Sequence, residues 1–166
     1  YDPAADAETT GGLPAGRHAS VFSTLAEQSI VVERILTRPA GDSVATSVVV
    51  GAPPRISDGY VASRWHLGIG PSEPAPAALV VYNVDNVDGT LTIEAVGPGG
   101  PSAIPSLTDI PLGPGAVLTI DLVAPDALGQ ELIVNASNRV FIERSLERGG
   151  ELSGRSGSWA LPASDF

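Results

Sequence analysis

Residues 77–96 read AALVVYNVDNVDGTLTIEAV, and this stretch decides the fold class. Its first eight residues are nearly all apolar on both faces of an extended chain, which is typical of a strand inside a sheet. Its last seven residues alternate, with Leu91 and Ile93 on one face, as a half-buried strand does. The Asp88-Gly89 pair between them favours a hairpin, because glycine readily adopts the positive φ that such a turn requires. The stretch therefore predicts two strands and a tight turn.

The rest of the chain has the same character. With 19 Gly and 15 Pro in 166 residues, almost every window is interrupted before a helical apolar pattern develops. Short Val-, Ile-, Leu- and Thr-rich runs bounded by turn residues recur instead. We expect strands near 18–25, 29–37, 43–50, 60–67, 77–84, 90–96, 115–123, 130–136, 138–147 and 153–160. This spacing predicts an all-β protein, an antiparallel β-sandwich (Ig-like or related) of about ten strands with little or no helix.

Charge and composition exclude several classes of function. The basic residues are nine arginines, without lysine, against 19 acidic residues, so the net charge is −10. Nucleic acids and anionic membrane surfaces both select for clustered basic residues, so neither is an expected partner. No apolar run reaches the roughly 18 residues of a membrane-spanning helix. Without cysteine, thiolate metal sites and disulfides are excluded, and we expect no cofactor.

The same features bear on where the protein resides. The chain begins at Tyr1 without a methionine, which we interpret as a removed leader or as a piece of a longer polypeptide. Together with the acidic composition, free of lysine and cysteine, this favours a secreted or cell-surface location.

An internal repeat is the most informative feature of the sequence. Residues 29–36 (SIVVERIL) resemble residues 139–146 (RVFIERSL), so that the Glu-Arg pair at positions 33 and 34 recurs at positions 143 and 144. Each copy follows a Pro/Gly turn and a strand, and each continues through a Gly-containing turn into a Ser-containing strand. The distance between the two copies is about the length of one β-sandwich domain and far exceeds that of a solenoid repeat.

The repeat predicts an uneven domain organisation. Residues 1–12 are small, acidic and unpatterned, so we expect a flexible arm. Residues 13–53 match only the back of the second copy, so we interpret them as a half-unit, packed on a neighbour or completed by one. Residues 54–166 form the complete sandwich unit. Three strands alone cannot bury both of their faces.

Several of these segments together resemble a known family. They are the run from Ala78 to Asn83, the strand that follows Pro114-Gly115, the run from Val31 to Leu36, and the closing RSGSWALP of residues 155–162. In these the chain is similar to an uncharacterised family of secreted actinobacterial proteins, described only as a domain of unknown function. The resemblance implies tandem β-sandwich units and carries no catalytic residues with it.

The repeated polar pairs are Glu33-Arg34 and Glu143-Arg144. On a strand, neighbouring side chains point to opposite faces, so Arg34 and Arg144 each fall within an apolar stripe. A buried arginine needs a partner. We expect a cross-strand ion pair, or an arginine stem lying over the core edge with its head in water, as structural roles. Recognition of a carboxylate ligand is the alternative.

A weak calcium candidate lies in the predicted hairpin loop. Asn83, Asp85 and Asp88 could supply oxygen ligands together with Asn86, but the EF-hand pattern is absent. A plain loop is the favoured interpretation, so we expect no metal site.

Aromatic residues are few, and Tyr60, Trp65 and Trp159 are the candidates for ligand-facing positions. Exposed aromatics would suit a glycan, whereas core anchoring is the alternative.

No nucleophile motif or phosphate loop is present in the sequence, so we expect the protein not to be an enzyme. A hydrolase is kept as a minor alternative. The favoured interpretation is an extracellular structural or interaction module that assembles with another copy of itself through β-strand complementation. The second is a cell-surface module that binds a glycan or protein ligand.

Overall fold

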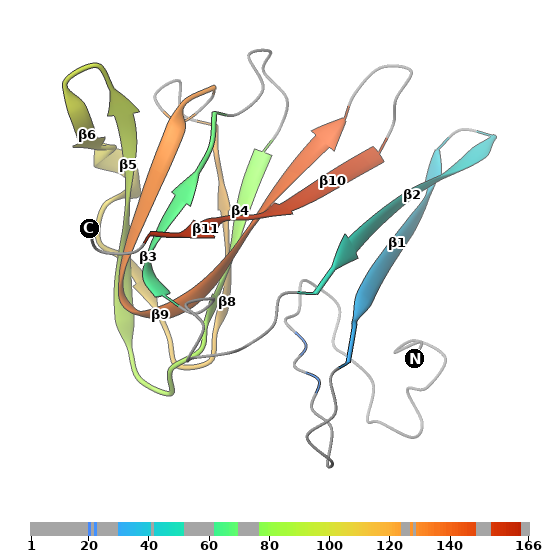
Figure 1. The fold of residues 1–166 in the computed structure, drawn as a ribbon, viewed down its shortest axis with the longest axis horizontal. Coiled ribbons are helices and arrows are strands. Elements are labelled where there is room, and N and C mark those ends of the chain that lie inside the picture. Colours follow the sequence, from blue (N-terminus) through green and yellow to red (C-terminus); the bar gives the residue numbers. More distant parts are fainter. Residues whose placement is uncertain are drawn as a thin grey trace.

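The structure, a computed structural model, describes residues 20, 22, 30–40, 42–51, 62–69, 77–123, 127, 129–148 and 154–163. These form eleven strands and one short 3₁₀ turn (Figure 1). The strands are β1 (Glu33–Ala40), β2 (Ser43–Val50), β3 (Ala62–Leu67), β4 (Ala77–Asn83), β5 (Gly89–Gly97), β6 (Gly100–Ala103), β7 (Ile110–Leu112), β8 (Val117–Asp121), β9 (Glu131–Arg148), β10 (Gly154–Trp159) and β11 (Leu161–Pro162); the 3₁₀ turn is η2 (Pro105–Leu107).

The fold is all-β and antiparallel, as predicted, and β9 organises it. This 18-residue strand pairs with β5 and β3 along its first part and with β4 and β10 along its second. Between Ala62 and Arg64 of β3, the partners on β9 jump from Val140 to Asn135. Residues 136–139 of β9 therefore lie opposite a single residue of β3, and this irregularity bends the strand. β9 is thus one continuous strand that pairs with different strands before and after its bend, in a sandwich-like sheet. Two separate strands, at 130–136 and 138–147, were predicted for this segment.

The core lies between these parts. Its buried members come mainly from β3, β4, β5, β8 and β9, with further members Ile104, Leu107 of η2, Leu112 of β7, Leu122, Ala127 and Ala160. The alternation predicted along 117–122 is confirmed from Thr119 onward, because Ile120 and Leu122 are buried whereas Thr119 and Asp121 are exposed. Val117 and Leu118 are both half-buried. The predicted central position of β4 is confirmed too, since β4 lies between β8 and β9.

The predicted β4–β5 hairpin is wrong. β4 pairs with β8 and β9, whereas β5 pairs with β6, β7 and β9. The segment 84–88 carries the chain from the second part of β9 to the first. The Asp88-Gly89 pair favours a hairpin locally, but pairing with the distant strand β9 prevails. β4 pairs with β9 on one side of its bend, and β5 pairs with β9 on the other side.

Glycine at position 89 is needed for space. Gly89 is not among the described glycines with positive φ. A Cβ at this position would lie 2.6 Å from the side chain of Asn138 and 2.8 Å from the hydroxyl of Ser137. The glycine therefore allows β9 to approach the loop closely.

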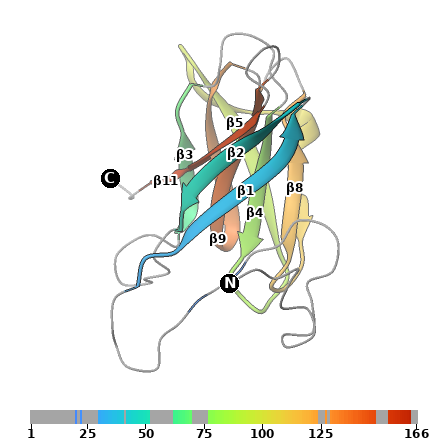
Figure 2. The ribbon, with the colours of Figure 1, turned by 90° about the vertical axis from the view of Figure 1, so that its right-hand side faces the viewer.

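β1 and β2 form a separate two-stranded sheet that is paired along the whole of both strands. This hairpin lies beside β10 in Figure 1, and Figure 2 shows its strands in front of the larger sheet. The predicted half-unit of residues 13–53 is thus represented by residues 20, 22, 30–40 and 42–51. The predicted arm of residues 1–12, most of the strand at 18–25 and the boundary between residues 53 and 54 lie outside the described residues. In the part of the chain that the structure describes, no helix is long and apolar enough to cross a membrane.

Candidate functional site

The β1–β2 hairpin packs with one face on the outer face of β9 and β10. Val49 is buried there and lies over Gly157, where a Cβ atom would sit 3.1 Å from the Val49 Cγ2 atom. Trp159 donates its indole N–H to the carbonyl oxygen of Val50 at 2.8 Å. Gly157 is thus a notch that receives the Val49 side chain, and Trp159 holds the end of β2.

An ion pair joins the two hairpins beside this notch. The guanidinium of Arg34 in β1 donates to Oε1 of Glu143 in β9. Glu143 is 7 % exposed, whereas the Arg34 side chain is 43 % exposed. The sequence singled out both residues and the expected ion pair of Arg34 is present, but it joins strands of different sheets and of different copies of the repeat.

The two hairpins have the same strand register. Glu33 lies opposite Val50 in β1–β2, and Glu143 lies opposite Trp159 in β9–β10. Glu143 is therefore the counterpart of Glu33, and Trp159 is the counterpart of Val50. The same correspondence aligns the two Glu-Arg pairs in the sequence, so the repeat is also a repeat of structure at this point.

A backbone hydrogen bond beyond each ladder repeats as well. The amide of Gly51 donates to the carbonyl oxygen of Val32 at 2.7 Å. At the corresponding place, the amide of Ala160 donates to the carbonyl oxygen of Ile142 at 3.0 Å. The equivalence therefore extends to the direction in which the main-chain groups point.

The surroundings of the two hairpins differ. The edge of β9 opposite β10 is occupied by β4, which places Val80 opposite Glu143. The corresponding edge of β1 pairs with no strand of the described residues. Val31 is 81 % exposed and Ile35 is 60 % exposed. Residues 30–32 were predicted as strand but precede β1, whose ladder begins at Glu33 opposite Val50, the last residue of β2.

Arg144 differs from its counterpart Arg34. Its side chain points into the molecule, is only 6 % exposed, and donates from Nη1 to the carbonyl oxygen of Gly68 at 2.8 Å. Burial lowers the pKa of this guanidinium. The expected arrangement, with the head of Arg144 in water, is wrong. Glu33, the fourth member of the two pairs, is exposed.

Two of the three aromatic candidates lie in the described residues, and the indole N–H of each donates to a backbone carbonyl oxygen. Trp65 is 2 % exposed and donates its indole N–H to the carbonyl oxygen of Ala62 at 2.9 Å, so it is a core residue and the ligand-facing interpretation is wrong for it. From sequence alone, a tryptophan in a strand is compatible with a core position and with a ligand-binding surface. Trp159 contacts Phe141 edge to face, with ring centroids 6.3 Å apart, and reaches the β1–β2 hairpin. Tyr60 lies outside the described residues.

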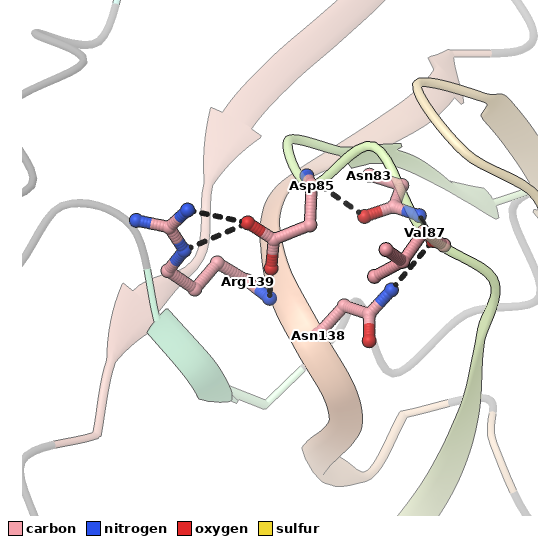
Figure 3. A network of polar contacts seen from close by, with 5 residues as sticks. All are labelled: Asn83, Asp85, Val87, Asn138 and Arg139. Carbon is pink, nitrogen blue, oxygen red and sulfur yellow. Dashed lines mark hydrogen bonds and ion pairs between the residues drawn. The ribbon is translucent and has the colours of Figure 1, made fainter.

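Two of the weak calcium candidates, Asn83 and Asp85, are engaged by protein groups (Figure 3). The side-chain amide of buried Asn83 donates to the carbonyl oxygens of Val87 at 2.9 Å and Gly113 at 2.8 Å, while its side-chain oxygen accepts the Asp85 amide at 3.0 Å. Asp85 is paired with Arg139, and Asp88 is exposed. Among the described residues no group of three His, Cys, Asp or Glu side chains could hold a metal ion.

The same network fastens the loop to the bend of β9. Arg139 donates to Asp85 from its backbone amide and from Nε, each at 2.9 Å. The hydrogen bond from the Arg139 side chain is the main cause that lowers the pKa of Asp85, and the hydrogen bond from the Arg139 backbone amide adds to it. The same contact raises the pKa of Arg139. Asn138 adds a hydrogen bond to the carbonyl oxygen of Val87 at 2.9 Å. These contacts make the loop a structural joint.

Gly157, Val49, Asn138 and Arg139 have roles here that the sequence did not indicate. Their signals are weak, because a glycine between two serines and a valine in an apolar strand are common. The alignment of the two copies could have located Gly157, since it places this glycine one residue from the counterpart of Val49.

Comparisons with known proteins add little. No family model matches the chain, and no curated protein does either. A crystal structure of a Thermotoga maritima protein, designated 1070, is similar over 60 % of this chain and 93 % of that one, with a TM-score of 0.47 and 12 % identity. The resemblance to the actinobacterial family therefore stays a prediction.

Proposed function

We propose that the protein is a non-enzymatic extracellular structural module that assembles by β-strand complementation at its β1–β2 hairpin, with a second copy of the chain as the first partner to test. One observation carries this proposal: β1 and β9 are equivalent strands, but among the described residues only β9 has a strand on its second edge. Unpaired strand edges bind other strands readily.

The exposed apolar side chains of the hairpin support the same proposal. Ile35, Val48 and Val50 share the face turned away from β10, and each is more than half exposed. The opposite face is docked through Val49 and Arg34. In the part of the chain that the structure describes, one face and one edge of this two-stranded sheet are uncovered. Such a sheet is marginal on its own, so a partner strand would stabilise it.

The extracellular location is part of the proposal and is supported by composition alone. The acidic chain without cysteine or lysine suits a secreted protein. A glycan-binding surface receives less support, because Trp65 belongs to the core and Trp159 is engaged with Val50.

The oligomeric state tests the proposal. Native mass spectrometry and light scattering, from micromolar to near-millimolar concentration, should show concentration-dependent association of the purified chain. Val31→Lys places a charge at the free edge and should weaken that association. Val87→Lys, at another well-exposed valine in the β4–β5 loop, is the matched control and should leave it unchanged. A chain that is monomeric at every concentration contradicts assembly with itself.

A further inference from the structure

The main-chain groups of β1 alternate between two directions. Because the Gly51 amide donates to Val32, the even-numbered residues of β1 face β2, and the odd-numbered residues face the other edge. The amides and carbonyls of Glu33 and Ile35 are therefore directed to an edge that has no partner strand among the described residues.

On β9 the corresponding groups are paired with β4. The amide of Val84 donates to the carbonyl oxygen of Arg139 at 3.0 Å, so the odd-numbered residues of β9 face β4. Val80 then pairs with Glu143, and Ala78 pairs with Ser145. Glu143 and Ser145 are the counterparts of Glu33 and Ile35 in the repeat.

We propose that the free edge of β1 binds an extended strand with the chemistry of β4, antiparallel and in the register in which β4 pairs with β9. The partner is a segment of another polypeptide, and the inference rests on the strand complementation proposed above but not on the partner being a second copy of this chain.

The register specifies the partner. Transferred from β9, it places the residue in the Val80 position opposite Glu33, and those in the Leu79 and Ala78 positions opposite Arg34 and Ile35. The partner is therefore small or aliphatic at successive positions, as β4 is.

Pro39 limits the length of the partner. It is an odd-numbered residue of β1, so its backbone faces the partner. Because proline has no amide N–H, no hydrogen bond can be donated to the partner from this position. The partner pairs along residues 31–37 and ends before Pro39.

A folded copy of this chain does not offer β4 as the partner. In addition to its bonds with β9, the backbone amide of Asn83 donates to Ala116 at 2.9 Å, and that of Leu122 donates to Ala77 at 2.8 Å. β4 is thus paired on both edges. The partner is an unpaired segment that resembles β4 in sequence.

A synthetic peptide with the sequence of residues 77–88 is the probe. Its titration into the full chain, followed by calorimetry, should show one site. In the variant Ile35→Pro, affinity should fall at least about tenfold, because the amide that faces the peptide is lost. The bonds to β2 are kept, since the amide of residue 35 does not face β2. A peptide carrying Pro in place of Val80 is the matched control and should bind as weakly.

Amide exchange measured by NMR keeps the test independent of whether the variant folds. In the wild-type chain, the peptide should slow exchange at Val31, Glu33 and Ile35 and leave Arg34 and Leu36, which already face β2, unchanged. Protection elsewhere, or equal binding by Ile35→Pro, overturns the inference.

The two proposals fail separately. Self-association without peptide binding at β1 overturns the inference on the partner and leaves the assembly function standing. Peptide binding by a chain that is always monomeric overturns self-assembly and supports the inference.

Discussion

The β1–β2 and β9–β10 hairpins share sequence, register and a terminal backbone hydrogen bond, yet within the described residues only one of them is complete. β9 has β4 on its second edge and the core beneath it, so Ile142 is fully buried. β1 has neither, and its side chains are largely exposed. The difference teaches that the sequence pattern of a strand specifies which side chains share a face. The burial and stability of the strand depend on the other strands and the core that pack against it.

The largest effect should come from the core position of the complete hairpin. Ile142→Ala should destabilise the protein by about 3 kcal/mol, because it leaves a cavity beneath β9. The counterpart, Val32→Ala, should cost less than about 1 kcal/mol, because Val32 is only half-buried. Urea unfolding monitored by circular dichroism compares the two. Equal costs would contradict the difference between the hairpins.

The notch between the hairpins should give the next effect. Gly157→Ala should cost about 1–2 kcal/mol, because the new Cβ would lie 2.6 Å from Glu143 Oε1 and 3.1 Å from Val49 Cγ2. Trp159 fluorescence and proteolysis of the hairpin report its release. Gly97→Ala, where nothing lies within 4 Å, is the control and should change neither signal. An unchanged hairpin in Gly157→Ala would show that it does not dock on β10.

The ion pair should contribute less. Glu143→Gln should loosen the hairpin by about 1 kcal/mol, since the half-exposed Arg34 is partly screened by water. Glu33→Gln, the counterpart in β1, should have no measurable effect because Glu33 is exposed. A double-mutant cycle with Arg34→Ala measures the coupling. No coupling between Arg34 and Glu143 would exclude the pair as a docking contact.

The smallest effect concerns the joint at the bend of β9, which has no described counterpart in the first hairpin. Because Arg139 lowers the pKa of Asp85 in the folded protein, Asp85 stabilises the fold above its ordinary pKa of 3.8. That contribution is lost as pH falls through the lower, folded pKa. Asp85→Asn should therefore flatten the decline of stability below about pH 4, as thermal unfolding across pH 2–6 would show. An unaltered pH profile would remove Asp85 from this role.

Alternation and turn residues were sufficient to predict much of the fold. Leu118, Ile120 and Leu122 identified β8, and the unbroken apolar run identified β4 as central. The partners of strands were not predictable in the same way. Asp88-Gly89 indicated a hairpin, but the bend at residues 136–139 lets β9 pair with both strands instead. Pairing is decided by distant segments, which a local pattern does not contain.

The candidate site shows the same limit. The sequence singled out Arg34 and Glu143 because they repeat, but it did not show that they bind each other. It could not place Trp65 in the core, because an aromatic residue in a strand pattern fits a core or a binding surface equally well. The notch at Gly157 depends on a contact between two sheets, so no single segment carries its signal.

Residue-resolved amide exchange of the monomeric chain tests the central claim most directly. If β1 is an incomplete copy of β9, Glu143 and Ser145 should exchange slowly, whereas Glu33 and Ile35 should exchange rapidly while Arg34, bonded to β2, is protected. Slow exchange at Glu33 and Ile35 in the monomer, matching that of Glu143 and Ser145, would show that the edge of β1 is already paired and would contradict the account.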